Sequence, residues 1–488
     1  MKMLPRRLSL GLAYALLSAC TGTATGPGGE TSSTPAAASA EPPAPASGSP
    51  AGGSPAAPPT DPNMPAPSVP GTPANLPTGR VTGNPFVGTT LYINPDYTRA
   101  VTESAARLPA GSADAALFSR AKSLPTGIWL DSIAALAGGS GNAQRMGLAA
   151  HLEAALQQGA ATGKPPMAVF VVYNLPNRDC AAAASNGQLQ GRAGLGTYRT
   201  QYIDVIAATL ASKPEFAKVR VALVIEPDSL PNMVTNLSLP ACAAVKSPDD
   251  LYHQGVLYAL QTFAKLPNVY LYLDIAHAGW LGWPSNMDLA VPYYVKLIKA
   301  VKGGDMTVVR GFATDIANYT PLVEPFISPT KTPALLTGAF YQSNPIFDEQ
   351  TFVAALSSRF TTAGMVDFGF ITDTSRSGWK LLNDGRPIDR RKQRSNWCNV
   401  GGSGLGVRPQ VAPAHDPHLD ALFYVKPPGE SDGAASAPAG GVSADGKRFD
   451  VNCSPTNPQL DALPEAPEAG AWFDAEYQML LRNATPAL

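Results

Sequence analysis

The chain has 488 residues, of which 44% are hydrophobic, enough to form one large α/β core or two modest ones. Its 36 lysines and arginines nearly balance its 37 aspartates and glutamates, which gives a net charge of -1. No overall field therefore draws the chain to nucleic acid or to an anionic membrane surface, and we expect a neutral partner and no nucleic-acid partner.

The first 20 residues have the layout of an export signal. Basic residues among the first seven precede an apolar run over residues 8–17, an order typical of a secretory signal peptide. The run is shorter than the roughly 20 apolar residues that span a bilayer. The tetrapeptide Leu-Ser-Ala-Cys, which ends at Cys20, resembles a bacterial lipobox. We predict a lipoprotein signal over residues 1–19 and a lipid on Cys20 as the only membrane attachment; the alternative is an ordinary cleaved signal with an incidental cysteine.

Residues 20–82 are predicted to be the lipidated cysteine followed by a disordered linker. From Thr21 to about Gly79 the chain is almost entirely Ala, Pro, Ser, Gly and Thr. Such a composition cannot bury enough apolar surface to offset the entropy lost on ordering. Residues 83–488 are predicted to form a single domain, which contains a second linker-like stretch from Pro427 to Gly446.

Beyond Gly83, short apolar runs alternate with helical patterns. The candidate strands are Thr90–Ile93, Gly127–Leu130, Met167–Val172, Arg220–Ile225, Val269–Leu273, Thr307–Phe312, Leu335–Phe340, Val366–Ile371 and Leu422–Val425. The candidate helices are Gln144–Gln158, Thr197–Ala211, Pro248–Lys265, Leu289–Val301, Phe347–Thr362 and Ala471–Asn483. This alternation predicts a parallel sheet buried on both faces, and a β/α barrel or a close variant is its natural closure. Periodicity also allows a doubly wound open sheet.

Acidic residues follow the predicted strands repeatedly, at Asp131, Asp179, Asp228 and Asp274. Each could cap a helix, yet in a β/α barrel all four would lie on the face that carries the working residues. Hydrolysis of a glycosidic bond needs one carboxylic acid that stays protonated, and burial or a second carboxylate nearby raises its pKa. Asp179 close to Asp228 would supply that arrangement. The sequence has no Asp-rich loop with metal-binding spacing, and we predict no metal and no cofactor.

The tryptophans fall mostly in or beside predicted loops. An indole ring can pack on the flat face of a pyranose, while each ring could equally fill the protein core. The six tryptophans are Trp129, Trp280, Trp283, Trp379, Trp397 and Trp472.

Four cysteines remain once Cys20 is set aside, an even number that predicts two disulfides in an exported chain. Three connectivities are open. The pairing Cys180–Cys242 with Cys398–Cys453 closes two separate loops without crossing. A metal site is the rival interpretation, but the chain has no Cys-x-x-Cys pair and no histidine flanking these cysteines.

Two segments resemble the signatures of glycoside hydrolase family 6, the inverting cellulases. They are Val171-Val172-Tyr173-Asn174-Leu175-Pro176-Asn177-Arg178-Asp179-Cys180, which continues to Ser185-Asn186-Gly187, and Leu223-Val224-Ile225-Glu226-Pro227-Asp228-Ser229-Leu230. Similar stretches follow at 272–283, 317–319, 397–400 and 425–427, so that the resemblance covers about residues 83–488. It implies a distorted parallel β/α barrel with fewer than eight barrel strands and long active-site loops.

The resemblance also implies roles for five residues. Asp228 matches the general acid, and Asp179 the aspartate that tunes its pKa and assists distortion of the sugar ring. Tyr173 matches the tyrosine beside the scissile sugar. Asp432 matches the aspartate often proposed as base, while a relay through Ser185 and Asp179 is the other route proposed for activating water. We predict the substrate contacts to be Trp129, Asp131, Arg178, Asp274, His277, Trp280, Trp283, Asn318, Trp397, Lys426 and Glu430.

Two long loop regions, Asp179–Thr197 and Lys426–Gly470, favour a cellobiohydrolase that releases cellobiose from the non-reducing end of cellulose. An endoglucanase of the same family is the alternative, and a non-catalytic glucan-binding surface lipoprotein is the alternative from another class. Trp379 matches no fixed position of the family, and the chain has no segment that resembles a carbohydrate-binding module. We expect a monomer.

Overall fold

The computed structural model describes residues 81–326, 337–379, 391–411, 416–437, 440–443 and 446–488. The predicted signal, Cys20 and nearly all of the predicted linker lie outside these residues. Within these ranges, the helices are all too short or too polar to cross a membrane.

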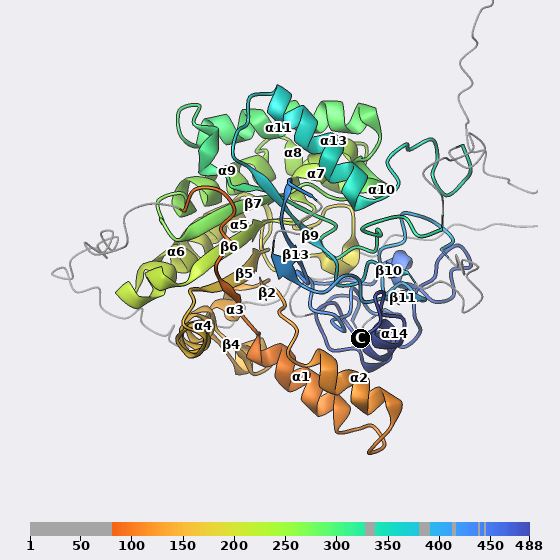
Figure 1. The fold of residues 1–488 in the computed structure, drawn as a ribbon. Helices are drawn as coiled ribbons and strands as arrows, with labels where there is room; N and C mark the ends of the chain where they lie inside the picture. The colour runs from red at the N-terminus through yellow and green to blue at the C-terminus, as the bar shows by residue number, and fades with distance from the viewer. Residues whose placement is uncertain (1–80, 327–336, 380–390, 412–415, 438–439, 444–445) are drawn as a thin grey trace, which may run out of the picture. The chain divides into compact units, whose positions relative to one another are not determined.

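A mostly parallel sheet of nine strands forms the centre of the described part (Figure 1). Strands β5 to β9 follow one another in order and β13 comes next, while β1 and β2 pair with the start and the end of β5. Only β12 runs antiparallel to its neighbour. The strands are β1 (Thr90–Leu91), β2 (Ile128–Leu130), β5 (Pro166–Val172), β6 (Arg220–Ile225), β7 (Val269–Asp274), β8 (Gly311–Thr314), β9 (Gly369–Asp373), β12 (Gln410–Val411) and β13 (Leu419–Phe423).

The sheet curls into a distorted barrel, which its two ends close through a single bridge. Thr126, just before β2, pairs in parallel with Tyr424, just after β13. The next residue, Gly127, donates its N–H to the carbonyl of Tyr424 at 2.8 Å. A Cβ at Gly127 would lie 2.3 Å from the carbonyl oxygen of Val425, so that only glycine allows this approach. The predicted distorted barrel is confirmed, and an open doubly wound sheet is excluded.

Strand β5 shows how one apolar run serves two cores. Alternate side chains of a strand point to opposite faces. Val169 and Val171 face the interior core of the barrel, while Ala168, Phe170 and Val172 face the surrounding helices. Both faces are buried, so the strand is apolar throughout.

Helices surround the sheet, with α9, α11 and α13 on one side of it in Figure 1. Several begin at residues whose side chains accept a backbone N–H of the first turn: Asn94, Ser112, Ser132 and Asp348. A π-helical segment, Tyr198–Ile203, joins α5 to α6. The helices are α1 (Pro95–Ala105), α2 (Ala113–Ala121), α3 (Ile133–Ala137), α4 (Leu148–Thr162), α5 (Gly191–Thr197), α6 (Asp204–Ala211), α7 (Ser229–Thr235), α8 (Pro240–Lys246), α9 (Leu251–Phe263), α10 (Ala278–Leu281), α11 (Pro284–Val301), α13 (Glu349–Thr362) and α14 (Asp474–Arg482).

Two predicted strands and one predicted linker need correction. The strand expected over Thr307–Phe312 begins only at Gly311, because Met306–Val308 forms a 3-10 turn. Residues 337–340 of the strand expected over Leu335–Phe340 are turns, and the rest of it lies outside the described residues.

The linker-like stretch Pro427–Gly446 is not a linker at its start. Ser431 is fully buried and Asp432 is 7% exposed. The hydroxyl of Ser431 donates to the carbonyl of Pro467 at 2.8 Å, and the N–H of Asp432 donates to the side chain of Asn399 at 2.8 Å. Long-range hydrogen bonds thus order a segment that composition alone suggested to be loose.

Candidate active site

A cleft of about 530 Å³ opens at the carboxyl ends of the parallel strands. Most predicted catalytic and substrate-binding residues line it, although they come from distant parts of the chain. These residues are Trp129, Asp131, Tyr173, Arg178, Asp179, Ser185, Asp228, His277, Trp280, Trp283, Asn318, Trp397, Lys426, Glu430 and Asp432.

Asp228 follows β6 and is partly buried in the wall of the cleft. Burial and the charges of Asp179, Asp274 and Asp432 raise the pKa of its carboxyl well above the usual range. Asp274 is buried and is not among the residues that line the cleft, and its substrate contact stays a prediction. Its carboxylate accepts the backbone N–H of Asp228 at 3.0 Å and thereby helps to hold the backbone of Asp228 in place.

Asp179 lies in the same cleft, after β5. Burial raises the pKa of Asp179 to about 6, although hydrogen bonds from Ser185 and Asn232 and the charge of Arg178 oppose the shift. The amide of Asn232 lies 3.4 Å from the Asp179 carboxylate. Two carboxyls with raised pKa values in one cleft are suited to holding and moving a proton near neutral pH.

The backbone at the carboxyl ends of β5 and β6 is strained. Asp179, Glu226 and Asp228 have φ values of 49°, 48° and 66°, in the left-handed region that disfavours side chains. Such residues cost about 1–3 kcal/mol each and concentrate at functional sites. Here the strain aims the two aspartates into the cleft.

Arg178 organises the loop after β5 rather than offering a free charge to the cleft. Its guanidinium is buried and lies 4.2 Å from the ring centre of Tyr173. It donates to the backbone carbonyls of Asp131, Tyr173, Ser185 and Asn186 at 2.6–3.1 Å. These bonds use four of its five N–H groups and fix the loop that carries Asp179 and Ser185.

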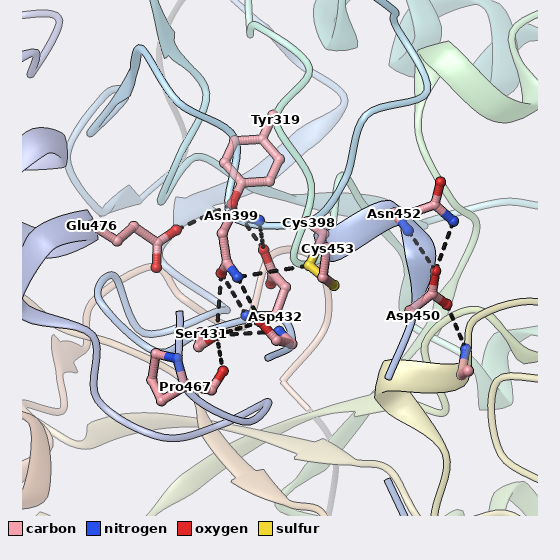
Figure 2. The surroundings of a disulfide bond; sticks show 12 residues. Tyr319, Cys398, Asn399, Ser431, Asp432, Asp450, Asn452, Cys453, Pro467 and Glu476 are labelled. Carbon is pink, nitrogen blue, oxygen red and sulfur yellow. Dashed lines mark hydrogen bonds between the residues drawn. A yellow bond between two sulfur atoms is a disulfide. The ribbon is translucent and has the colours of Figure 1, made fainter. Parts of the chain in front are cut away.

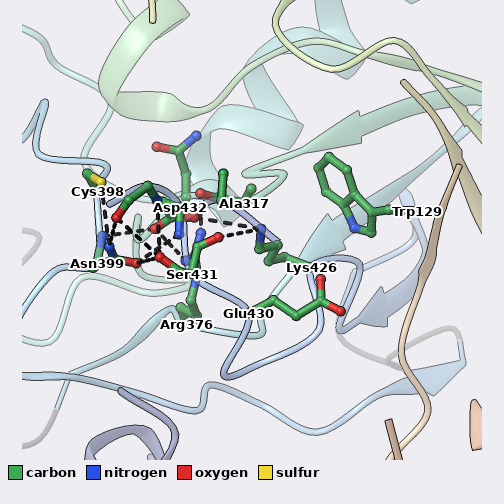
Figure 3. A network of polar contacts seen from close by, with 12 residues as sticks. Trp129, Ala317, Arg376, Cys398, Asn399, Lys426, Glu430, Ser431 and Asp432 are labelled. Carbon is green, nitrogen blue, oxygen red and sulfur yellow. Dashed lines mark hydrogen bonds and ion pairs between the residues drawn. The ribbon is translucent and has the colours of Figure 1, made fainter. Parts of the chain in front are cut away.

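Asp432 faces the cleft from the loop after β13, in a dense polar network (Figure 3). One carboxylate oxygen, Oδ2, accepts hydrogen bonds from Tyr319 Oη (2.8 Å), Arg376 Nη1 (2.6 Å) and the backbone N–H of Asn399 (2.9 Å). The other oxygen, Oδ1, lies 3.9 Å from Lys426 Nζ. These donors stabilise the charged carboxylate.

The indole N–H groups of two cleft tryptophans, Trp129 and Trp280, are hydrogen-bonded to the protein, which holds these rings in place. Trp129 donates to the carbonyl of Val425 at 2.9 Å, and Trp280 donates to the hydroxyl of Thr235 at 2.7 Å. Trp379 is different: it is 4% exposed and does not line the cleft. For Trp379, the core-filling alternative is therefore the right one.

Two disulfides pair Cys180 with Cys242 and Cys398 with Cys453, as predicted. The second lies directly beside the Asp432 segment (Figure 2). A Cβ at Gly433 would come within 2.6 Å of the sulfur of Cys453, so that this loop packs tightly against the bridge.

The two long loops that line the cleft also touch each other. Ala183, in the first loop, donates its N–H to the carboxylate of Asp450 at 2.7 Å. Its carbonyl accepts the N–H of Arg448 at 3.1 Å. Both partners belong to the second loop, which also contributes Lys447, Asn452 and Gly470 to the lining.

Some cleft residues were not predicted. Arg145 lies on β4 (Arg145–Met146), which pairs with β3 (Gly138–Gly139) in a short hairpin before α4. Its guanidinium lies 3.9 Å from the carboxylate of Glu430. No motif marked this hairpin, which is short and rich in glycine. Asn236, Asn286 and Ser395 are further unpredicted lining residues.

A buried cluster behind the cleft has the residue types of a metal site. Ligand atoms of His277, Asp315 and Glu349 lie within 4.8 Å of one another. Burial raises the pKa of Glu349 to about 8, while the charge of Arg394 lowers the pKa values of both Glu349 and His277. A cation beside the cluster and a carboxyl that stays neutral favour a retained proton over a metal ion.

Comparison with known proteins places these features in a class of enzymes. The sequence profile described as "Glycosyl hydrolases family 6" matches residues 86–484. Exoglucanase A of Cellulomonas fimi is 40% identical over 437 residues, which cover 83% of this chain but only 49% of that protein. Exoglucanase 2 of Hypocrea jecorina is 36% identical over 407 residues, or 83% of this chain and 76% of the relative.

Solved structures agree. The catalytic domain of Cellulomonas fimi Cel6B has a TM-score of 0.77 at 39% identity and covers 84% of this chain and 97% of that domain. Cellobiohydrolase II of Humicola insolens, in complex with glucose and cellotetraose, has a TM-score of 0.70 at 35% identity, with 83% and 100% covered. The fold and the cleft are those of a glycoside hydrolase. The chain belongs to glycosyl hydrolases family 6.

Proposed function

We propose that this chain hydrolyses the β-1,4-glucosidic bonds of cellulose with inversion of configuration and releases cellobiose from the non-reducing end. The observation that carries the proposal is Asp228, a partly buried carboxyl with a strongly raised pKa in a cleft lined by tryptophans. The named relatives are exoglucanases and cellobiohydrolases, and one neighbour holds cellotetraose.

In the proposed reaction, the carboxyl of Asp228 gives its proton to the leaving glycosidic oxygen as the C1–O bond breaks. Water attacks C1 from the opposite face and passes a proton to Asp432, whose Oδ1 is the less occupied carboxylate oxygen. Inversion needs room for this water between acid and base. Asp179, which Ser185 helps to hold, keeps Asp228 protonated by its charge and assists distortion of the ring.

Contact between the two long loops supports exo action over endo action. Ala183 joins them through both its N–H and its carbonyl. A glucan would then reach the cleft by its end rather than sideways. Trp129, Lys426 and Glu430 lie side by side in Figure 3 and are proposed to bind the sugar units, together with the other predicted contacts that line the cleft.

The product mixture from phosphoric-acid-swollen cellulose tests this function. We expect cellobiose as the main soluble product, slow loss of viscosity from soluble glucan, and the α-anomer as the first product seen by NMR. Rapid loss of viscosity with mixed oligosaccharides would make the chain an endoglucanase. Glucan binding without hydrolysis would favour the non-catalytic alternative.

Export and attachment concern residues that the structure does not describe. The two disulfides support export, since such bonds persist in oxidising compartments. We propose that residues 1–19 are a signal peptide, that Cys20 carries a lipid and that residues 20–82 tether a monomeric domain, 83–488, at the bacterial surface. Cys20→Ser should release the protein from membranes, and a variant that still sediments with membranes would rule out the anchor.

A further inference from the structure

A second buried carboxyl group lies behind Asp432. Glu476, on α14, is fully buried (Figure 2). Its Oε1 lies 3.1 Å from the hydroxyl of Tyr319 and 3.5 Å from Nη1 of Arg376. The same hydroxyl and the same nitrogen bond Oδ2 of Asp432 at 2.8 and 2.6 Å. Two carboxyl groups thus share two donors.

The shared donors cannot serve both carboxylates fully. The Tyr319 hydroxyl has one proton, and Arg376 Nη1 donates to that hydroxyl at 2.8 Å. A Tyr319 proton given to Asp432 leaves Oε1 of Glu476 with only the longer contact to Arg376. The other oxygen of Glu476, Oε2, is buried and has no hydrogen-bond partner within the described residues. An ionised Glu476 would therefore be poorly compensated.

Charges around Glu476 agree with a neutral form. Burial is the largest influence and raises the pKa of Glu476 to about 7; the charge of Asp432 adds to the rise, while Arg376, Lys426 and Tyr319 oppose it. Asp432, Arg376, Lys426 and Tyr319 are the charged or titratable groups with the largest influence on the pKa of Glu476. The carboxyl consequently changes its protonation near neutral pH.

We propose that Glu476 is a positioning residue for Asp432. In its protonated form it leaves the Tyr319 proton and the shorter Arg376 bond to Asp432, and these bonds hold the carboxylate of Asp432 aimed into the cleft. In its ionised form it takes a share of both donors, and Asp432 loses its fixed orientation. This inference rests on the proposed role of Asp432 as the acceptor of the water proton.

The test is the pH dependence of kcat/KM on β-cellobiosyl fluoride. Fluoride leaves with little help from a proton, so that ionisation of Asp228 contributes little to the alkaline side of the profile. We expect Glu476→Gln, which mimics the neutral acid, to keep activity within about twofold at pH 5.5 and to move the alkaline limb upward by about one pH unit or more. Superimposable profiles would overturn the proposal.

A matched control is available at Asp420, another buried carboxylate that bonds one arginine and one tyrosine, Arg310 and Tyr272. Asp420→Asn should leave the profile unchanged, since its network does not reach the cleft. If Glu476→Gln does not fold, Tyr319→Phe tests the same link, because it removes the shared hydroxyl. We expect Tyr319→Phe to lower kcat/KM severalfold and to shift the alkaline limb of its pH profile. A lower kcat/KM with an unshifted limb would contradict the link between Glu476 and Asp432.

Failure of this inference can be told from failure of the proposed function. If the wild-type chain releases no cellobiose from cellulose, the function is wrong. If it does, and the limb of a folded Glu476→Gln protein does not move, only the role of Glu476 is wrong.

Discussion

An arginine–tyrosine–carboxylate network lies at each of the two ends of strands β8, β9 and β13, and the two networks differ in how their hydrogen-bond donors are shared. At the amino ends, Arg310 donates to both oxygens of Asp420, at 2.6 and 2.8 Å, and Tyr272 adds a third bond at 2.7 Å. The third nitrogen of Arg310, Nη1, contacts the exposed Asp367 at 3.1 Å, so that Asp420 shares none of its donor atoms with another carboxyl group. At the carboxyl ends, Arg376 and Tyr319 are divided between Asp432 and Glu476.

The difference shows that residue types alone do not distinguish an ion pair that stabilises the fold from one that holds a proposed catalytic residue. An arginine whose nitrogens each serve a single carboxylate gives a settled network that holds strands together. A hydroxyl and an arginine nitrogen that two carboxyl groups share leave a proton that can move with pH. The two ends also differ in their acidic residues, because Asp179, Asp228 and Asp274 lie together at the end that carries the cleft.

The largest effect is expected at the carboxyl end, from Asp228→Ala. A glucose hydroxyl is a poor leaving group that needs the proton, so hydrolysis of cellulose should fall by about 10³-fold or more. The aryl group of an activated aryl cellobioside leaves with little proton help, so that the rate of hydrolysis of this substrate should fall far less, within about tenfold. Initial rates on both substrates measure this. Asp179→Ala should lower both rates, and a folded Asp228→Ala protein that still degrades cellulose would refute the acid.

At the amino end the expected loss is one of stability. Asp420→Ala would leave Arg310 with only the exposed Asp367 as its partner, and removing one partner of a buried pair destabilises by about 3–5 kcal/mol. Urea denaturation should show this loss, while kcat of the folded protein stays unchanged. A reduced kcat without loss of stability would mean that the network at the amino ends affects catalysis, which would contradict the distinction drawn between the two ends.

The two disulfides offer a finer comparison, because they close loops of similar length, 62 and 55 residues apart in sequence. Removing either should cost about 2–4 kcal/mol. Replacing both Cys398 and Cys453 with alanine should also lower activity on cellulose more than replacing the other pair, since Asn399, next to Cys398, holds Asp432. Chemical denaturation and specific activity measure the two effects, and equal activity losses would contradict this role.

The smallest predicted effect concerns pH and stability. Burial raises the pKa values of Glu226 and Glu476 to about 7 and of Glu349 to about 8. Between about pH 4.5 and 8 the folded chain therefore binds more protons than the unfolded chain, and stability falls as pH rises. We expect a melting temperature a few degrees higher at pH 5 than at pH 8. Glu349→Gln should flatten this slope, and a melting temperature that rises with pH would contradict the shifts.

The sequence predicted strands and acidic site residues well where one continuous segment contains both. The predicted strand Arg220–Ile225 matches β6 at both ends, and Asp228 follows it in one continuous motif. Helices α1 and α2 went unpredicted, because α1 is largely polar and α2 has only two buried residues.

Features that depend on contacts between distant segments could not be predicted. Asp274 follows a predicted strand as the other acids do, yet it is the last residue of β7 and its carboxylate accepts the N–H of Asp228. Glu476 and Arg376 are 100 residues apart in the chain and meet only through folding. Arg145 enters the cleft from a hairpin with no sequence motif. Such residues become recognisable only when the barrel brings the loops together.

Under the proposed function, Ala183 has a consequence for how long the chain stays on a glucan. Its N–H and its carbonyl hold the two long loops together with two hydrogen bonds. A glucan threaded beneath that contact would leave by sliding lengthwise, whereas opening the contact would let it lift away. The ratio of successive cuts to dissociation would then depend on these two bonds, which use backbone groups of Ala183 that remain whatever side chain replaces its methyl group.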